Sequence, residues 1–242
     1  MNVRVNLLAI FVLSICSNYA LAQFDTVINL PENPDSPNPS GFSGNSIGRF
    51  SGISSNTQLN VSDGGSIGFQ FDAGAEDVSN TNIEVNISGG AVGFDFDANS
   101  GSTVNISGGD VGFGFNANSG STVNISGGTF GNNFQAFDGS TVNLFGTEFF
   151  LNGSLIDAST LGEPFTIFDR GEDVVLSGVF ADGTPFDFDL DPNDFYFSPF
   201  DFFDPNSTLT ITRVVAVPEP GCGLTLATMS LVLLVRRRRA LR

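Results

Sequence analysis

Apolar and polar residues alternate in short runs through the middle of the chain. In Val104-Asn105-Ile106 every second residue is apolar, and the run from Val111 to Phe115 has the same period of two, which is the period of a β-strand. Stretches rich in Gly, Asn and Ser, such as residues 118–120, separate the runs and favour turns, because Gly and Asn tolerate a left-handed backbone. No stretch of this region has the 3.6-residue period of a helix, so the pattern predicts an all-β fold.

One hexapeptide recurs at a fixed spacing. Val-Asn-Ile-Ser-Gly-Gly at residues 85–90 returns at 104–109 and at 123–128, so the spacing is 104 − 85 = 19 and then 123 − 104 = 19. A degenerate copy of the hexapeptide begins at Val142, and an earlier degenerate copy begins at Leu59. Fixed periods of this length are typical of solenoids. Together with the strand alternation, they predict a single-stranded parallel β-helix of about five rungs, each built from a 19-residue repeat.

Stacked rungs bring equivalent residues into columns about 4.8 Å apart. We expect apolar columns inside the solenoid, and an amide ladder of Asn86, Asn105 and Asn124 on its outside. The pattern does not decide whether the column that contains Phe113 and Asn132 points inward or outward, because Asn132 would be an unpaired polar group if it pointed inward. The expected core residues are Val85, Ile87, Val104, Ile106, Val111, Phe115, Val123, Ile125 and Phe134.

The repeats at 46–155 are flanked by segments of different composition. Four prolines lie between Pro31 and Pro39, so residues 23–45 are expected to form a stiff, Pro/Ser-rich linker. After residue 155 the period stops, and short apolar runs around a Gly-containing loop predict a β-rich C-terminal cap at 156–215. A separate small domain is the alternative for this segment.

The segment 1–22 has the layout of a secretory signal peptide. Arg4 precedes a largely apolar run at 7–16, and Ala20-Leu21-Ala22 is a small-x-small cleavage site that would leave Gln23 as the first mature residue. Lipoprotein processing at Cys16 is the weaker alternative, because the residue before a lipidated cysteine is normally small and here it is Ile15. This end of the chain therefore predicts export.

Three elements follow one another in the last segment, residues 216–242. Val217, Pro218, Glu219 and Pro220 form a stiff motif, residues 221–235 are apolar and uncharged, and Arg236, Arg237, Arg238 and Arg239 come next. As a helix, the apolar part would extend about 22 Å. That is short of the roughly 30 Å hydrocarbon core, so a transmembrane segment here needs flanking residues or a thinner bilayer. The arginines would stay on the cytoplasmic side.

This ordered tail resembles the PEP-CTERM sorting signal. The resemblance implies that an exosortase-type processing enzyme recognises the chain during export. The protein would then be anchored in the membrane at the cell surface, or released to the extracellular matrix, where exopolysaccharide is a potential partner. An ordinary C-terminal membrane anchor is the alternative and has the same topology. Both terminal hydrophobic segments are expected to be helical.

Outside these two segments the chain is strongly acidic. Residues 23–220 contain Arg49, Arg170 and Arg213 and all 26 acidic residues, so their net charge is 3 − 26 = −23. Such a surface repels phosphate, and no nucleic-acid partner is expected. The chain has no His, and both cysteines, Cys16 and Cys222, lie in the targeting segments. We therefore expect no cofactor, no metal site and no disulfide in the mature protein.

Three local patterns admit a sharper interpretation. The Phe- and Asp-rich segment 186–204 could bind sugars or cations, but its alternation favours a half-buried strand. Asp97 is replaced by Asn116 and Gln135 in later copies, which argues against a calcium-binding nonapeptide repeat. The Asn-x-Ser triplets match the glycosylation signal, but they recur because the repeat recurs.

These features favour a non-enzymatic protein of the cell surface or extracellular matrix with a structural or adhesive role. At the level of the fold, the repeat-plus-cap layout resembles bacterial autotransporter-type β-helical adhesins. The alternative is a carbohydrate-active enzyme, a polysaccharide lyase or hydrolase, with Asp95 and Asp97 as acid and base. Such lyases usually need a basic side chain beside the cleaved sugar, and this chain has few, so we expect no catalytic residue.

Overall fold

A computed structural model describes residues 24–215 except 36, 41, 43, 76–78, 158–159 and 194–199. This part of the chain is all-β and contains no helix. Among the residues described, we find no helical segment with the length and apolar character needed to cross a membrane. Several predicted features lie outside the described residues: the expected signal peptide with Ala20, Ala22 and Gln23, the expected sorting motif 217–220, the apolar segment 221–235 and the arginines 236–239.

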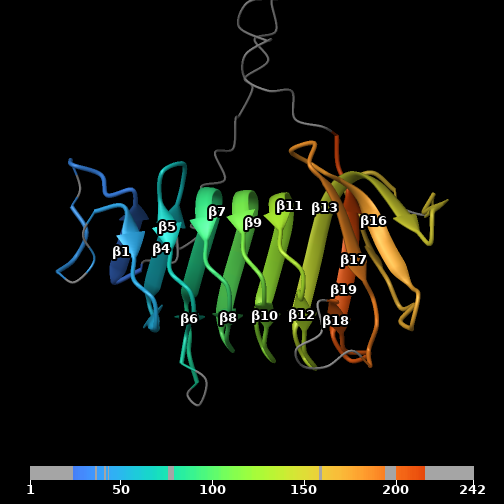
Figure 1. The fold of residues 1–242 in the computed structure, drawn as a ribbon, viewed down its shortest axis with the longest axis horizontal. Coiled ribbons are helices and arrows are strands. Elements are labelled where there is room, and N and C mark those ends of the chain that lie inside the picture. The colour runs from blue at the N-terminus through green and yellow to red at the C-terminus, as the bar shows by residue number, and fades with distance from the viewer. Residues whose placement is uncertain are drawn as a thin grey trace, which may run out of the picture.

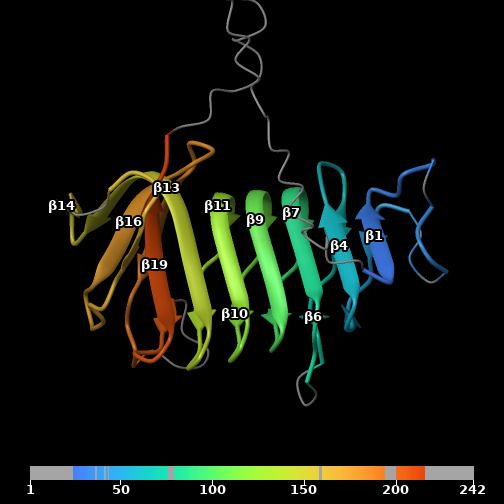
Figure 2. The same cartoon turned by 180° about the vertical axis from the view of Figure 1, so that it is seen from behind.

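The larger of two sheets runs along the molecule as a row of parallel strands (Figure 1), seen from behind in Figure 2. Val85, Val104, Val123 and Val142 are direct partners on successive strands, so the repeat spacing corresponds to one step across the sheet. In spatial order these strands are β1 (Thr26–Leu30), β4 (Thr57–Val61), β7 (Ile83–Val92), β9 (Ser102–Val111), β11 (Thr122–Phe130), β13 (Thr141–Leu151) and β19 (Thr208–Arg213). The short strands β2 (Ser46–Ile47) and β5 (Ser66–Ile67) pair with each other, and β5 pairs with β7.

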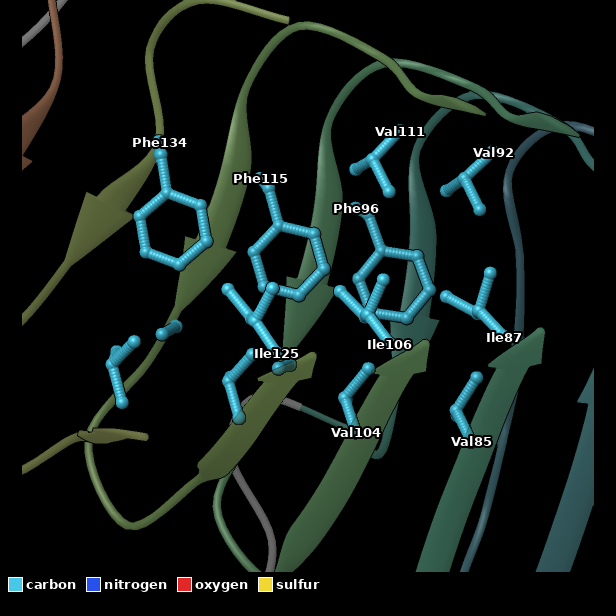
Figure 3. Packing of buried hydrophobic residues seen from close by; sticks show 14 of the residues in the cluster. Val85, Ile87, Val92, Phe96, Val104, Ile106, Val111, Phe115, Ile125 and Phe134 are labelled. Atoms are coloured by element: carbon cyan, nitrogen blue, oxygen red, sulfur yellow. The ribbon is translucent and has the colours of Figure 1, made fainter. Parts of the chain in front are cut away.

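The smaller sheet has six short strands, all parallel. They are β3 (Ser51–Ile53), β6 (Phe71–Ala73), β8 (Phe96–Ala98), β10 (Phe115–Ala117), β12 (Gln135–Ala136) and β18 (Phe202–Phe203). Side chains from both sheets point toward one another (Figure 3) and belong to one hydrophobic cluster. Each repeat therefore contributes one strand to each sheet, with the core between them.

A Gly-Gly pair turns the chain within each long strand. Gly90, Gly109 and Gly128 have φ angles of 76°, 91° and 93°, a left-handed conformation that glycine adopts without strain. A side chain on Gly109 would also press against the backbone of Gly89 and Gly90 in the preceding copy. The strand register shifts at this point, so the sheet bends there.

The residues expected in the core are all buried. The rings of Phe96 and Phe115 stack with centroids 5.0 Å apart, and those of Phe115 and Phe134 stack at 5.2 Å (Figure 3). Phe71 extends this column at one end and Phe203 at the other. The column left open by the sequence faces outward, because Phe94 is 50% exposed, Phe113 is 43% exposed and Asn132 is also exposed.

The expected linker 23–45 was wrong for residues 26–30, which form β1. Thr26-Val27-Ile28-Asn29-Leu30 has the same polar–apolar pattern as residues 57–61, its parallel partners in β4. Ile28 and Leu30 are buried in the core. The prolines begin at Pro31, after β1 ends, so they do not prevent residues 26–30 from forming a strand, and burial of Ile28 and Leu30 together with pairing to β4 stabilises it.

The side chain of Asn38 occupies the free edge of β1. Its Nδ2 donates a hydrogen bond to the carbonyl oxygen of Asn29, and its Oδ1 accepts one from the Asn29 N–H, both at 2.8 Å. Glu32 holds Asn38 in place, because its Oε1 accepts from the Asn38 N–H at 3.1 Å. An amide that pairs with both backbone groups imitates one more strand, and it blocks pairing with a second molecule at this residue.

Asn38→Ala is expected to lower the free energy of unfolding by about 1 kcal/mol and to increase self-association, because it leaves the backbone of Asn29 unpaired. Sedimentation velocity and thermal unfolding measure the two effects. Asn33→Ala is the control, since Asn33 lies in the same loop and accepts only a local bond from the Asp35 N–H. A variant as monodisperse as the parent protein would contradict a protective role for Asn38.

The C-terminal segment 156–215 only partly forms the expected cap. β16 (Val175–Phe180) and β17 (Pro185–Asp189) form an antiparallel hairpin around the Gly-containing loop, and the short strands β14 (Ser154–Leu155) and β15 (Pro164–Thr166) pair antiparallel with β13 and β19. Strands β18 and β19 instead continue the two parallel sheets, because Phe203, Leu209 and Ile211 extend the core columns. The cap boundary was therefore wrong for residues 202–213. The parallel row extends past the five expected repeats, by β1 at one end and β19 at the other.

Candidate functional site

A groove of about 900 Å³ lies on the outer surface of the smaller sheet. Asp97, Asn116 and Gln135 occupy equivalent positions on β8, β10 and β12 and line it. Phe and Ala on either side of these residues point into the core, so the strand alternation turns the three polar side chains outward. One polar residue from each repeat thus forms the floor of the groove.

Hydrogen bonds fix the orientation of the amides in the groove. Asn116 Nδ2 donates to Asp97 Oδ1 at 2.8 Å, and Gln135 Nε2 donates to Asn133 Oδ1 at 2.6 Å. On the next turn of the chain, Asn118 Nδ2 donates to Asn99 Oδ1 at 2.8 Å. The Asn116–Asp97 and Asn118–Asn99 bonds link neighbouring repeats, so this part of the polar surface is held by the same register that builds the sheet.

A left-handed turn precedes each short strand. Asp95 and Asn133 have φ angles of 57° and 66°, and Gly114 has a φ angle of 76° at the equivalent position between them. Asp and Asn tolerate this region better than other residues with a side chain. Asp95 and Asn133 both line the groove, so this turn adds a carboxylate and an amide to it.

Aromatic side chains are the apolar part of the groove. Phe113 lines it and is 43% exposed, and Phe137 and Phe202 line it with ring centroids 5.7 Å apart. The exposed column continues from Phe113 to Phe94 on the preceding repeat, and Phe69 stacks on Phe94 at 4.9 Å. The groove therefore offers an accessible ring face beside its polar floor.

The charged residues that line the groove are all acidic. They are Asp95, Asp97, Asp138 and Asp204. Arg170 lies near Asp204, but its guanidinium lies over the ring of Phe203 at 5.9 Å and donates to the carbonyl oxygens of Ile167 and Asp169. Burial lowers the pKa of Arg170, while the charges of Asp169 and Asp204 oppose that shift. The potential in the groove is therefore negative.

A second, smaller cavity of about 290 Å³ is lined by Asp201, whose carboxyl accepts a hydrogen bond from the N–H of Phe134 in the ring column. Burial raises the pKa of the Asp201 carboxyl to about 7, although hydrogen bonds from the Phe134 and Asp189 N–H groups oppose the shift. Those bonds measure 2.7 and 3.2 Å. Within the described ranges, no group of three or more acidic, His or Cys side chains has an arrangement suited to a metal ion.

The predicted amide ladder is confirmed. Asn105 Nδ2 donates to Asn86 Oδ1, and Asn124 Nδ2 donates to Asn105 Oδ1, both at 2.8 Å. The complete ladder is Asn29, Asn60, Asn86, Asn105, Asn124 and Asn143, and it ends at the hydroxyl of Thr210. Because these amides are engaged on neighbouring strands, the Asn-x-Ser triplets have a structural role in the sheet.

The Phe- and Asp-rich segment behaves as a half-buried strand where the structure describes it. Phe186 and Phe188 are buried in the core and Asp187 is exposed. Farther along the segment, Phe202 and Asp204 line the groove. The sequence interpretation missed these two residues because their place depends on β18 lying beside β12, and it missed Asp138, which follows β12.

Of the acid–base pair considered from the sequence, the groove includes both Asp95 and Asp97. The alternation of Asp97, Asn116 and Gln135 between buried residues was the available signal for the floor. Comparisons with known proteins gave no match among family models, curated proteins or solved structures.

Proposed function

We propose that this chain is an exported, non-enzymatic protein of the cell surface or extracellular matrix whose groove binds an exopolysaccharide. The observation that carries this proposal is the combination of carboxylates, oriented amides and an exposed phenylalanine on one face of the smaller sheet. Sugars present hydroxyl groups that donate and accept hydrogen bonds, and C–H faces that pack on aromatic rings. The groove has a complement for each of these groups.

Rigid placement supports binding without large entropic losses. The floor amides are already held by hydrogen bonds to Asp97 and Asn133, so they lose little freedom when a ligand arrives. A volume of about 900 Å³ is also at the upper end of the usual range for small-molecule sites, and suits an oligosaccharide.

The scaffold that we propose is a single-stranded parallel β-helix. Three observations support it: the repeat spacing equals one strand step, each repeat adds one strand to each of two parallel sheets, and both sheets share one core. Such a fold repeats its surface groups along one direction. It suits an extended polymer better than a compact ligand.

The proposed location rests on the two ends of the chain. The signal peptide and the ordered PEP-CTERM-like tail support export, an exosortase-type processing partner, and attachment to the membrane or release to the matrix. The net charge of 3 − 26 = −23 over residues 23–220 supports a soluble, displayed surface.

Affinity measurements on immobilised polysaccharides test the proposal. We expect Phe113→Ala to weaken binding about three- to tenfold, since one ring contact is worth roughly 0.5–1.5 kcal/mol. Phe94→Ala is the matched control, because Phe94 is similarly exposed but does not line the groove. Equal losses in both variants, or no retention of any glycan by the parent protein, would contradict a glycan-binding groove.

A carbohydrate-active enzyme on the same scaffold is the second candidate, because the groove contains both Asp95 and Asp97. The described residues that line the groove include no basic side chain, which supports binding over lyase chemistry. Reducing-end release from neutral and acidic polysaccharides distinguishes the two. Reproducible turnover that Asp97→Asn abolishes would replace the binding proposal with an enzymatic one.

A further inference from the structure

We infer that the preferred ligand of the groove is a polysaccharide that carries free amino groups. This inference rests on the proposed glycan binding and names the class of glycan. It is carried by the distribution of charge and ring faces along the groove.

Charge complementarity selects against acidic glycans. The described lining of the groove has four carboxylates and no basic side chain, and the nearby Arg170 is engaged with backbone carbonyls and the Phe203 ring. A uronic-acid or sulfated polymer would therefore meet only like charge. An ammonium group has three donors and forms charge-assisted hydrogen bonds with carboxylates, which are about twice as strong as neutral ones.

The carboxylates are separated along the groove by an uncharged middle. Asp95 and Asp97 belong to the β8 repeat, whereas Asp138 and Asp204 follow β12 and β18. Between them, the β10 repeat contributes Phe113 and the Asn116 amide. The ligand that fits this order has cationic groups toward both ends and a sugar ring over Phe113.

The strand spacing suits an extended glycan that lies across the strands. Neighbouring strands are about 4.8 Å apart, which is close to the length of one sugar unit in an extended β-linked chain. A β-linked polymer of glucosamine thus places about one unit on each repeat. Because successive units of an extended β-1,4-linked chain face opposite sides, amines on one side recur every second unit, which matches the two strand steps from β8 to β12.

Titration calorimetry of the full chain with three hexasaccharides tests this inference: β-1,4-linked glucosamine, its N-acetylated form and the corresponding glucose oligomer. We expect the free-amine hexamer to bind at least tenfold more tightly than the other two. The preference should shrink as salt is raised from low to physiological strength and beyond, because salt screens exposed charges.

Two charge-matched double variants locate the effect. Asp95→Asn with Asp138→Asn is expected to reduce the preference to about one, because it neutralises a carboxylate toward each end of the groove. Asp25→Asn with Asp157→Asn removes the same charge from exposed residues that do not line the groove, and is expected to preserve the preference.

The outcomes separate the inference from the proposed function. Equal affinity for the three hexamers would overturn the amine preference and retain glycan binding. An equal loss in both double variants would show that a polycation binds the acidic surface in general, and would overturn the assignment to the groove. No binding of any hexamer would overturn both.

Discussion

Phe115→Ala is expected to lower the free energy of unfolding by about 3–5 kcal/mol, the usual cost of removing a fully buried phenylalanine. Phe115 is 2% exposed and lies between the rings of Phe96 and Phe134, with interplanar angles of 6° and 5°. The substitution removes both stacking contacts in the middle of the column. It leaves a cavity that the flanking strands cannot close, because their backbones are hydrogen-bonded in register.

Denaturant unfolding measures this loss, and Phe113→Ala is the matched control. Phe113 precedes Phe115 on the outward side of the chain, and its ring is 43% exposed. Its replacement is expected to change stability by less than about 1 kcal/mol. If the two variants unfolded at the same denaturant concentration, the assignment of Phe115 to the core would be wrong.

The stability of the protein is expected to fall as the pH rises from about 4 to about 7, because of Asp201. Burial raises the pKa of this carboxyl from an ordinary 3.8 to about 7 in the folded protein. Between these values the folded state keeps a proton that the unfolded state has released, so the stabilisation is complete below the unfolded pKa and is lost through the folded pKa. The full difference is on the order of 4 kcal/mol.

Asp201→Asn isolates this effect, because the neutral amide does not titrate. The amide introduced by Asp201→Asn can accept from only one of the two N–H groups, so the variant carries a loss of stability that does not depend on pH. The stability of the parent minus that of the variant should fall between about pH 4 and about pH 7. Asp157→Asn removes the same charge from an exposed residue, and its difference from the parent is expected to stay nearly constant with pH. A parent-minus-variant difference for Asp201→Asn that is independent of pH would mean that the carboxyl is solvated.

The strand register and the core columns could be predicted because both follow from the local sequence of each repeat. Alternation places Val104 and Ile106 on one face of the strand and Asn105 on the other, and the constant repeat spacing aligns each with its counterparts. A one-residue slip would turn every apolar side chain toward water. The pattern therefore leaves one favourable pairing.

The positions of β1 and β19 at the two ends of the row of parallel strands were not predicted, although both strands have the polar–apolar pattern of their partner strands. Thr208-Leu209-Thr210-Ile211 resembles residues 141–144, its parallel partners in β13, but the separation along the chain is 208 − 141 = 67. That separation exceeds the repeat spacing by 67 − 19 = 48, and the hairpin and other antiparallel strands fill this insertion. Local pattern does not specify whether a chain returns to a sheet after such an insertion, because that depends on the buried columns left open by the preceding strand.

The groove was only partly predictable for the same reason. The outward positions of Asp97 and Asn116 follow from alternation. The placement of Asp95 depends on a left-handed turn, for which Gly114 at the equivalent position was the one hint. Phe202 and Asp204 join the groove only because β18 pairs with β12, and no local pattern states that pairing.

Stacking of the strands in register is the premise on which the groove and the proposed glycan binding depend, and a pair of spin labels tests it directly. Positions Gln58 and Thr208 are joined by five successive strand steps through Glu84, Thr103, Thr122 and Thr141. The labels are attached to cysteines introduced at these two positions, and the native Cys16 and Cys222 are replaced by serine. Pulsed electron–electron double resonance should then give one narrow distribution of distances between the labels. Five steps correspond to backbone positions about 24 Å apart. A broad distribution, or a distance far from this value for two positions so distant in the sequence, would contradict the stacked arrangement.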